Sequence, residues 1–311
     1  MPARRTTFVL AWAGLGLALA LAAALYLVPA LGINRLSLRY LADLGQGALA
    51  PPEGHPRAAY WGALRALDEG DGQLAVETLE LLAVEGDSLV QQTLGRAYEA
   101  SGDLRAAMGI WERMGNEYAL LEMGESATQA RDLETAQEAY ARAWVVDPGG
   151  HSTARLAGFL WGQKGDPGAA EEVLRWSLAN CPSCSKRPYW YRQLAELLEA
   201  EGRWAEAAEA RQGVIQTAHL MIIRNRQEDA FYSNLAWAYH MSGQTEAALA
   251  AIDEALSLSE SHPKEAILNR AGQIYEAAGE REKALGAYRQ VLALDPADAD
   301  ARAAVARLAG E

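Results

Sequence analysis

Apolar and small residues recur at helical intervals along most of this chain, and the pattern is clearest near its C-terminal end. Ala284, Tyr288 and Leu292 are spaced four residues apart, which places them on one face of a helix. Gly279 precedes this helix as a turn residue. Pro296 ends it, because proline has no backbone N–H to donate and disfavours helical geometry in the residue before it.

A second helical face lies immediately upstream. It consists of Leu268, Gly272 and Tyr275, and it ends at Gly279. The two faces together predict a helix–turn–helix unit. Two short helices alone bury too little surface to offset the entropy lost on ordering them. We therefore expect the unit to stack on copies of itself.

The unit recurs along the chain. Tyr239 lies 36 residues before Tyr275, and Pro148 lies 34 residues before Pro182. A degenerate first copy occupies residues 60–82. The other copies place similar residues at similar intervals: Leu94, Gly95, Tyr98, Ala107 and Trp111; Leu120, Gly124, Ala127, Ala136 and Tyr140; Ala157, Gly158, Trp161, Ala170 and Leu174; Leu194, Ala195, Leu198 and Ala207; Leu235, Ala236, Tyr239, Ala248 and Ala255.

This combination of Leu-Gly or Leu-Ala, Tyr, Ala, Tyr and Pro at a period of 34 residues resembles the tetratricopeptide repeat. The resemblance covers residues 58–298 and implies an all-α solenoid of about seven helix pairs. Small residues let two helices approach closely, and an aromatic ring fills the space beside them. Residues 299–311 are expected to form a helix that caps the stack.

The N-terminal part of the chain has a different pattern. Residues 8–31 are 24 almost wholly apolar residues, long enough as a helix to span a bilayer. We expect a tail and transmembrane anchor over residues 1–34, followed by a juxtamembrane helix and linker over residues 35–57. A cleaved signal peptide is the alternative, since Val28-Pro29-Ala30 resembles a cleavage site.

The charges beside this segment bear on its orientation. Arg4 and Arg5 favour a cytoplasmic N-terminus, whereas Arg35 and Arg39 on the other side oppose it. We expect a single-pass membrane protein whose C-terminal domain lies outside the cytoplasm.

Composition and motifs narrow the classes of function. The net charge is −13, and because Arg4 and Arg5 precede the apolar segment, residues 35–311 carry −15. Nucleic acid is therefore not expected as a partner, because phosphate binding requires a basic surface. The sequence has no phosphate-binding glycine loop and no metalloprotease motif, and its five histidines are scattered. We expect no enzymatic activity, cofactor or metal site.

Cys181 and Cys184 are the only cysteines, in a CxxC arrangement within a predicted loop. A local disulfide is expected if the domain is exported. Two alternatives remain open at this stage: inert free thiols, and a redox dithiol or half of a shared metal site.

Tetratricopeptide domains, as a family, bind segments of other proteins, so the resemblance implies a scaffold or adaptor. The first helix of each pair usually lines the binding groove in that family, and a free helical face there defines our candidates. Trp237 and Phe159 are the aromatic candidates, and both could instead fill space between repeats. The predicted partner-binding residues are Arg155, Phe159, Arg192, Glu196, Ser233, Trp237, His240, Asn269 and Gln273.

Three hypotheses follow for the function. The first is a membrane-tethered scaffold that holds other protein subunits of a membrane or envelope complex. The second is a solenoid that assembles with copies of itself as a homo-oligomer. The third is a redox or metal-handling role for the two cysteines.

Overall fold

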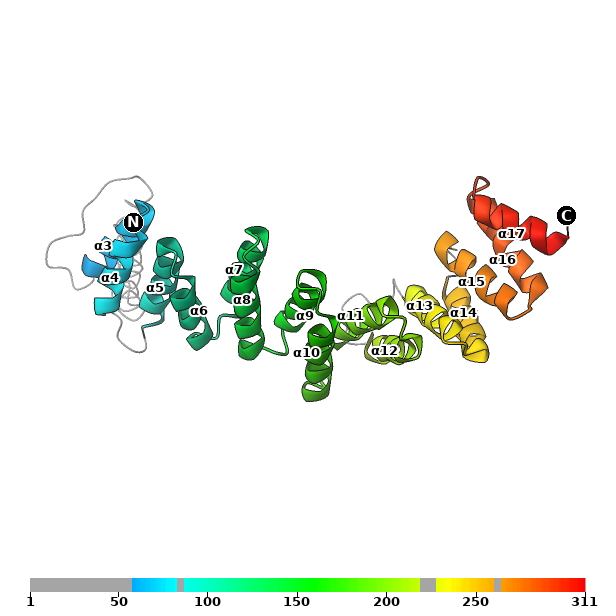
Figure 1. Cartoon of the computed structure of the whole chain (residues 1–311), viewed down its shortest axis with the longest axis horizontal. Coiled ribbons are helices and arrows are strands. Elements are labelled where there is room, and N and C mark those ends of the chain that lie inside the picture. The colour runs from blue at the N-terminus through cyan, green and yellow to red at the C-terminus, as the bar shows by residue number, and fades with distance from the viewer. Residues whose placement is uncertain (1–57, 83–86, 219–227, 260–263, 311) are drawn as a thin grey trace, which may run out of the picture. The chain divides into compact units, whose positions relative to one another are not determined.

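The structure, a computed structural model, describes residues 58–82, 87–218, 228–259 and 264–310. Fifteen α-helices follow one another over these ranges, and no β-strand occurs in them (Figure 1). The all-α prediction is therefore confirmed for the described residues. The chain divides into two compact units, residues 1–103 and residues 104–311, and each is described by itself.

Three helices make up the described part of the first unit: α3 (Ala58–Asp68), α4 (Gly72–Leu82) and α5 (Ser88–Ser101). Each contacts the other two. Inside their core, the Tyr60 hydroxyl and Thr93 Oγ1 share a hydrogen bond of 3.0 Å. A β-carbon at Gly72 would lie 2.5 Å from the backbone nitrogen of Ser101. A larger residue at position 72 would therefore push α4 away from α5.

The second unit holds the remaining twelve helices. They are α6 (Leu104–Arg113), α7 (Glu117–Gln129), α8 (Leu133–Val146), α9 (Ser152–Gly162), α10 (Pro167–Asn180), α11 (Arg187–Ala200), α12 (Trp204–Thr217), α13 (Glu228–Met241), α14 (Thr245–Leu258), α15 (Glu265–Ala277), α16 (Arg281–Leu294) and α17 (Ala299–Ala309).

Successive helices of the second unit pack in pairs. α7 lies along α8, α9 along α10, α11 along α12, α13 along α14, and α15 along α16 (Figure 1). The second helix of each pair also contacts the first helix of the next pair. First helices contact one another as well, α7 with α9, α9 with α11, and α13 with α15. We call the solvent-facing side of α9, α11, α13 and α15 the first-helix face.

The turn residues fall where the sequence predicts them. Gly279 separates α15 from α16 with a φ of +80°, a left-handed conformation that glycine adopts without steric cost. Arg131 takes the equivalent place between α7 and α8, with a φ of 62°. This left-handed conformation costs more free energy for arginine than for glycine, because arginine has a β-carbon. Helix α16 ends at Leu294, just before Asp295 and Pro296, as expected.

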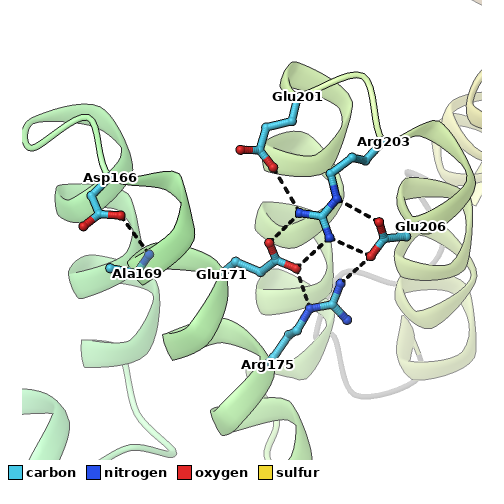
Figure 2. Close-up of polar contacts among 7 residues, drawn as sticks. All are labelled: Asp166, Ala169, Glu171, Arg175, Glu201, Arg203 and Glu206. Atoms are coloured by element: carbon cyan, nitrogen blue, oxygen red, sulfur yellow. Dashed lines mark hydrogen bonds and ion pairs between the residues drawn. The ribbon is translucent and has the colours of Figure 1, made fainter.

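Ion pairs join α10 to the start of α12 (Figure 2). The guanidinium of Arg203 contacts Glu171 at 2.6 Å, Glu206 at 2.7 Å and Glu201 at 3.1 Å. Arg175 contacts Glu171 at 2.6 Å and Glu206 at 3.0 Å. Hydrogen bonds from Arg203 lower the pKa of both Glu171 and Glu206. The network thus links two consecutive helix pairs through their second helices.

The predicted membrane anchor at residues 8–31 and the linker at residues 35–57 lie outside the described residues. Within the described ranges, no helix is both long and apolar enough to cross a bilayer.

Candidate functional site

The predicted partner-binding residues lie on four first helices of the second unit, and the structure gives them different surroundings. Arg155, Glu196 and Gln273 are exposed, whereas Arg192, Trp237, His240 and Asn269 are partly buried. Phe159 and Ser233 are buried.

Phe159 is not the exposed aromatic that the sequence suggested. Its side chain is only 4% exposed, and its ring lies 5.2 Å from that of Tyr140, centroid to centroid. The reason is that α9 packs against α8 of the preceding pair, and Phe159 points into that contact. The expectation of a free ring at this position was wrong, and the alternative that it fills space between repeats is correct.

Ser233 is also buried, at 2% exposure, so its placement on a free face was wrong. Its hydroxyl accepts a hydrogen bond of 3.1 Å from Nη1 of Arg270. Ser233 faces α15, because α13 and α15 are in contact. This contact covers the part of the α13 surface on which Ser233 lies.

Trp237 remains partly exposed and has two neighbours. The Arg270 guanidinium lies over its ring at 5.6 Å from the centroid, and the His240 ring is 5.3 Å away. Arg270 also donates a hydrogen bond of 2.7 Å to Oδ1 of Asn234. Burial lowers the pKa of Arg270. Among the described residues, no carboxylate lies within ion-pair distance of this guanidinium.

Arg192 and Glu196 line a cavity of about 380 Å³ between α11, α12 and α13. Arg211, Asn234 and Lys264 also line it. All three of its cations have a carboxylate partner: Arg211 binds Glu199 at 2.8 Å, Lys264 binds Asp229 at 2.6 Å, and Arg192 lies 3.9 Å from Glu196. This cavity is polar but close to electrically balanced.

Arg192 also borders a second, smaller cavity of about 200 Å³ between α9 and α11. His151, Lys186, Tyr189 and Gln193 are among the residues that line it. These four residues are not among the predicted binding residues. The run of three aromatic residues flanked by cations over residues 186–192 is the signal that could have indicated Lys186 and Tyr189.

Two further candidates, Arg155 and Asn269, have local roles, whereas for Gln273 the structure gives only its exposure. Arg155 forms an ion pair of 3.0 Å with Glu125 of α7. Asn269 donates a hydrogen bond of 3.3 Å to Oδ2 of Asp298, whose other oxygen caps α17 by accepting from the Ala301 N–H. The Ala301 hydrogen bond is the main reason that the pKa of Asp298 is lowered. Asn269 therefore lies beside the terminal helix.

The largest of these cavities, about 580 Å³, lies between α14, α15 and α16. Its charged groups are in contact with one another: Asp253 accepts a hydrogen bond from Tyr275 and lies 3.6 Å from Nζ of Lys283. None of the predicted binding residues lines it.

Cys181 and Cys184 form a disulfide in the loop between α10 and α11, with their Cα atoms 5.4 Å apart. The bond lies against the loop before α9, where a β-carbon at Gly149 would be 2.9 Å from Sγ of Cys184. Nη1 of Arg187 donates to the Cys181 carbonyl at 3.1 Å. No group of three or more potential metal ligands occurs among the described residues.

Comparisons with known structures give relatives of the fold. The C-terminal part of a TPR repeat-containing protein from Cytophaga hutchinsonii is 14% identical, with a TM-score of 0.51 over 79% of this chain and 99% of that one. The Naa15/Naa10 structure bound to HypK-THB is 14% identical, with a TM-score of 0.53 over 81% of this chain and 38% of that one. At these identities the likeness concerns the fold alone.

The family comparison concerns the last two helix pairs. The family described as tetratricopeptide repeat matches residues 230–262, which span α13 and α14, and again residues 265–298, which span α15 and α16. A comparison with curated protein sequences finds no match. These two helix pairs are therefore tetratricopeptide repeats, and the chain shares its fold with a solved TPR repeat-containing protein.

Proposed function

We propose that this protein is a non-catalytic scaffold that binds a segment of another polypeptide on its first-helix face. The observation that carries the proposal is the combination of a partly exposed Trp237, an Arg270 guanidinium over its ring that forms no ion pair among the described residues, and two cavities that Arg192 borders. Aromatic and arginine side chains in such settings are frequent anchors of protein interfaces. The Naa15/Naa10 structure, a relative of the fold, is itself a complex with another protein.

We further propose that residues 8–31 tether the scaffold to a membrane, with the repeats outside the cytoplasm. The length of the apolar segment and the two arginines before it support this placement. A tethered scaffold would hold subunits of a membrane or envelope complex near the bilayer.

Purification of the full chain from detergent-solubilised membranes, followed by mass spectrometry, tests the proposal. We expect foreign subunits in stoichiometric amounts with the wild-type chain and a several-fold loss of them with Trp237→Ala. Trp176→Ala is the matched control, because Trp176 is 46% exposed but lies on α10, a second helix. That variant should retain the partners.

Three outcomes would contradict the proposal or its binding face. A chain that purifies only with copies of itself would favour the self-assembling solenoid. Equal recovery of partners with Trp237→Ala, in a variant with an unchanged melting temperature, would remove the first-helix face from the interaction. If Trp237→Ala instead unfolds the domain, Trp237 is a core residue and its assignment to the binding face is wrong.

A further inference from the structure

The small cavity between α9 and α11 has features that set it apart from the rest of the first-helix face. Gly150, His151 and Ala154 line it from the start of α9, and Lys186, Tyr189, Trp190, Arg192 and Gln193 line it from α11. Its volume of about 200 Å³ admits a side chain with its peptide group rather than a larger element.

Two buried polar atoms in this lining have no hydrogen-bond partner. They are Nε1 of Trp190, a donor, and Oε1 of Gln193, an acceptor. Over the described residues, no other buried side-chain nitrogen or oxygen atom lacks a hydrogen-bond partner. Trp190 is completely buried. An unsatisfied buried polar group costs about 1–3 kcal/mol, so a ligand or water that supplied the missing partners of these two atoms would be stabilised there.

A hydrogen bond from the amide nitrogen of Gln193 fixes the orientation of its side-chain amide. Nε2 of Gln193 donates a hydrogen bond of 3.0 Å to the Ala154 carbonyl. Oε1 is therefore the free atom, and it requires a donor from a ligand. Nε1 of Trp190 requires an acceptor. A simple inorganic anion satisfies only the second requirement, whereas a peptide group supplies both an N–H and a carbonyl.

The charges around the cavity indicate the side chain of that ligand. Lys186 and Arg192 flank the Tyr189 ring, at 6.0 Å and 5.4 Å from its centroid. No carboxylate is among the residues that line the cavity. The Arg192 guanidinium has a loose ion pair with Glu196 at 3.9 Å, and Lys186 has no ion-pair partner among the described residues. The α11 side of the rim is therefore cationic, whereas on the α9 side a β-carbon at Gly150 would lie 2.6 Å from a carboxylate oxygen of both Asp147 and Glu117.

We propose that this cavity, the α9–α11 subsite, binds an acidic residue of a partner polypeptide. Its carboxylate lies between Lys186 and Arg192, its carbonyl accepts from Nε1 of Trp190, and its N–H donates to Oε1 of Gln193. This inference rests on the proposed scaffold function and adds the chemical class of the segment that the scaffold recognises.

A peptide selection tests the subsite. The full chain in lipid nanodiscs is presented with a random heptapeptide phage library, with empty nanodiscs as the background. We expect the enriched peptides to share an Asp or Glu at one position. A fluorescent copy of the most enriched peptide should bind at least about tenfold more weakly to Lys186→Gln/Arg192→Gln, because a charged hydrogen-bonding partner is lost. Replacing the shared acidic residue by its amide should have the same effect.

Lys164→Gln is the control, since Lys164 is an exposed lysine in the turn between α9 and α10. It should bind the peptide as the wild type does. The indole N–H of Trp190 provides a second readout by NMR, with its resonance assigned through Trp190→Phe. We expect it to shift on addition of the peptide, and to stay in place on addition of sodium acetate alone.

The outcomes separate this inference from the proposed function. Peptides that are enriched without an acidic position, or whose binding survives Lys186→Gln/Arg192→Gln, would refute the subsite and leave the scaffold intact. An unmoved Trp190 resonance with a bound peptide would mean that the cavity holds water only. Failure to enrich any peptide above the background would contradict the scaffold function itself.

Discussion

Gly272 of α15 lies directly against the ring of Tyr288 in α16, and a β-carbon at Gly272 would be 2.5 Å from Cε1 of that ring. The same relationship occurs four helix pairs earlier, where a β-carbon at Gly124 of α7 would be 2.7 Å from Cε1 of Tyr140 in α8. The glycine thus allows the two helices of a pair to approach until the tyrosine fills the space between them.

We expect Gly272→Leu to overpack this crossing and lower the free energy of unfolding by about 1–3 kcal/mol. The Tyr288 ring is 5% exposed and has little room to move aside. Chemical denaturation followed by circular dichroism measures the change.

Gly286→Ala is the matched control for that substitution. Gly286 is also a helix-interior glycine, but a β-carbon there would meet nothing within 4 Å. Alanine should therefore stabilise α16 by about 0.5–1 kcal/mol through its higher helix propensity. A stability gain with both Gly272→Leu and Gly286→Ala would show that the close approach is not as described.

The network around Arg203 should make stability depend on pH. Hydrogen bonds from Arg203 lower the pKa of Glu171 below its ordinary value of 4.5, and the same holds for Glu206. A carboxylate whose pKa is lower in the folded state contributes stability above its unfolded pKa, and this contribution is lost as the pH falls through the folded pKa. Arg203→Gln should therefore lower the melting temperature at pH 7.

The difference between wild type and Arg203→Gln should then shrink on acidification from pH 7 to about pH 3, because below pH 4.5 the unfolded chains take up protons on these carboxylates before the wild-type network does. Scanning calorimetry at the two pH values measures it. A difference that is the same at both would mean that Arg203 stabilises the fold through packing of its side chain instead of its charge.

Breaking the ion pair between Arg211 and Glu199 should lower the free energy of unfolding far more than breaking an exposed ion pair. The Arg211 side chain is 8% exposed, and its Nε and Nη2 donate to the two oxygens of Glu199 at 2.8 Å and 2.9 Å. Arg211→Ala leaves a carboxylate without its partner in a largely buried setting, and we expect a loss of about 3 kcal/mol.

Arg65→Ala is the comparison for the buried pair, because Arg65 and Glu69 are both at least half exposed. Arg65→Ala should lower the free energy of unfolding by less than about 1 kcal/mol. Equal losses for Arg65→Ala and Arg211→Ala in denaturant titrations would contradict the difference in burial.

The disulfide should contribute little to stability despite its position. Cys181 and Cys184 are three positions apart, so the bond closes a very short loop and removes little entropy from the unfolded chain. We expect Cys181→Ser/Cys184→Ser to cost at most about 2 kcal/mol. Alkylation of the native protein with and without reductant, followed by mass spectrometry, reads the state of the bond. Two thiols that alkylate without reductant would contradict either the bond or the placement of the domain outside the cytoplasm.

The helices and their turns could be predicted from the sequence because they depend on local chemistry. Gly279 permits a left-handed turn, Pro296 stops a helix, and Ala284 with Tyr288 marks a buried face, whatever the rest of the chain does. Repetition of these signals at a near-constant interval then determined the kind of fold, since each pair is stable only against its neighbours.

Tertiary structure decided which side chains on the first helices are free. Phe159 and Ser233 have the same helical spacing as exposed candidates, but α8 covers the first and α15 covers the second. Helical periodicity gives the face on which a residue lies, not the neighbour that reaches that face from another repeat.

The α9–α11 subsite likewise became visible only in three dimensions. Trp190 and Gln193 look like ordinary core and groove residues in the sequence, and nothing local shows that one donor and one acceptor stay unpaired. Hydrogen-bond satisfaction depends on atoms from two helices 30 to 40 residues apart in sequence, such as the Ala154 carbonyl that takes up the other end of Gln193. The sequence by itself determined the helices and their stacking, and the tertiary contacts alone decided where the stack leaves polar groups for a partner.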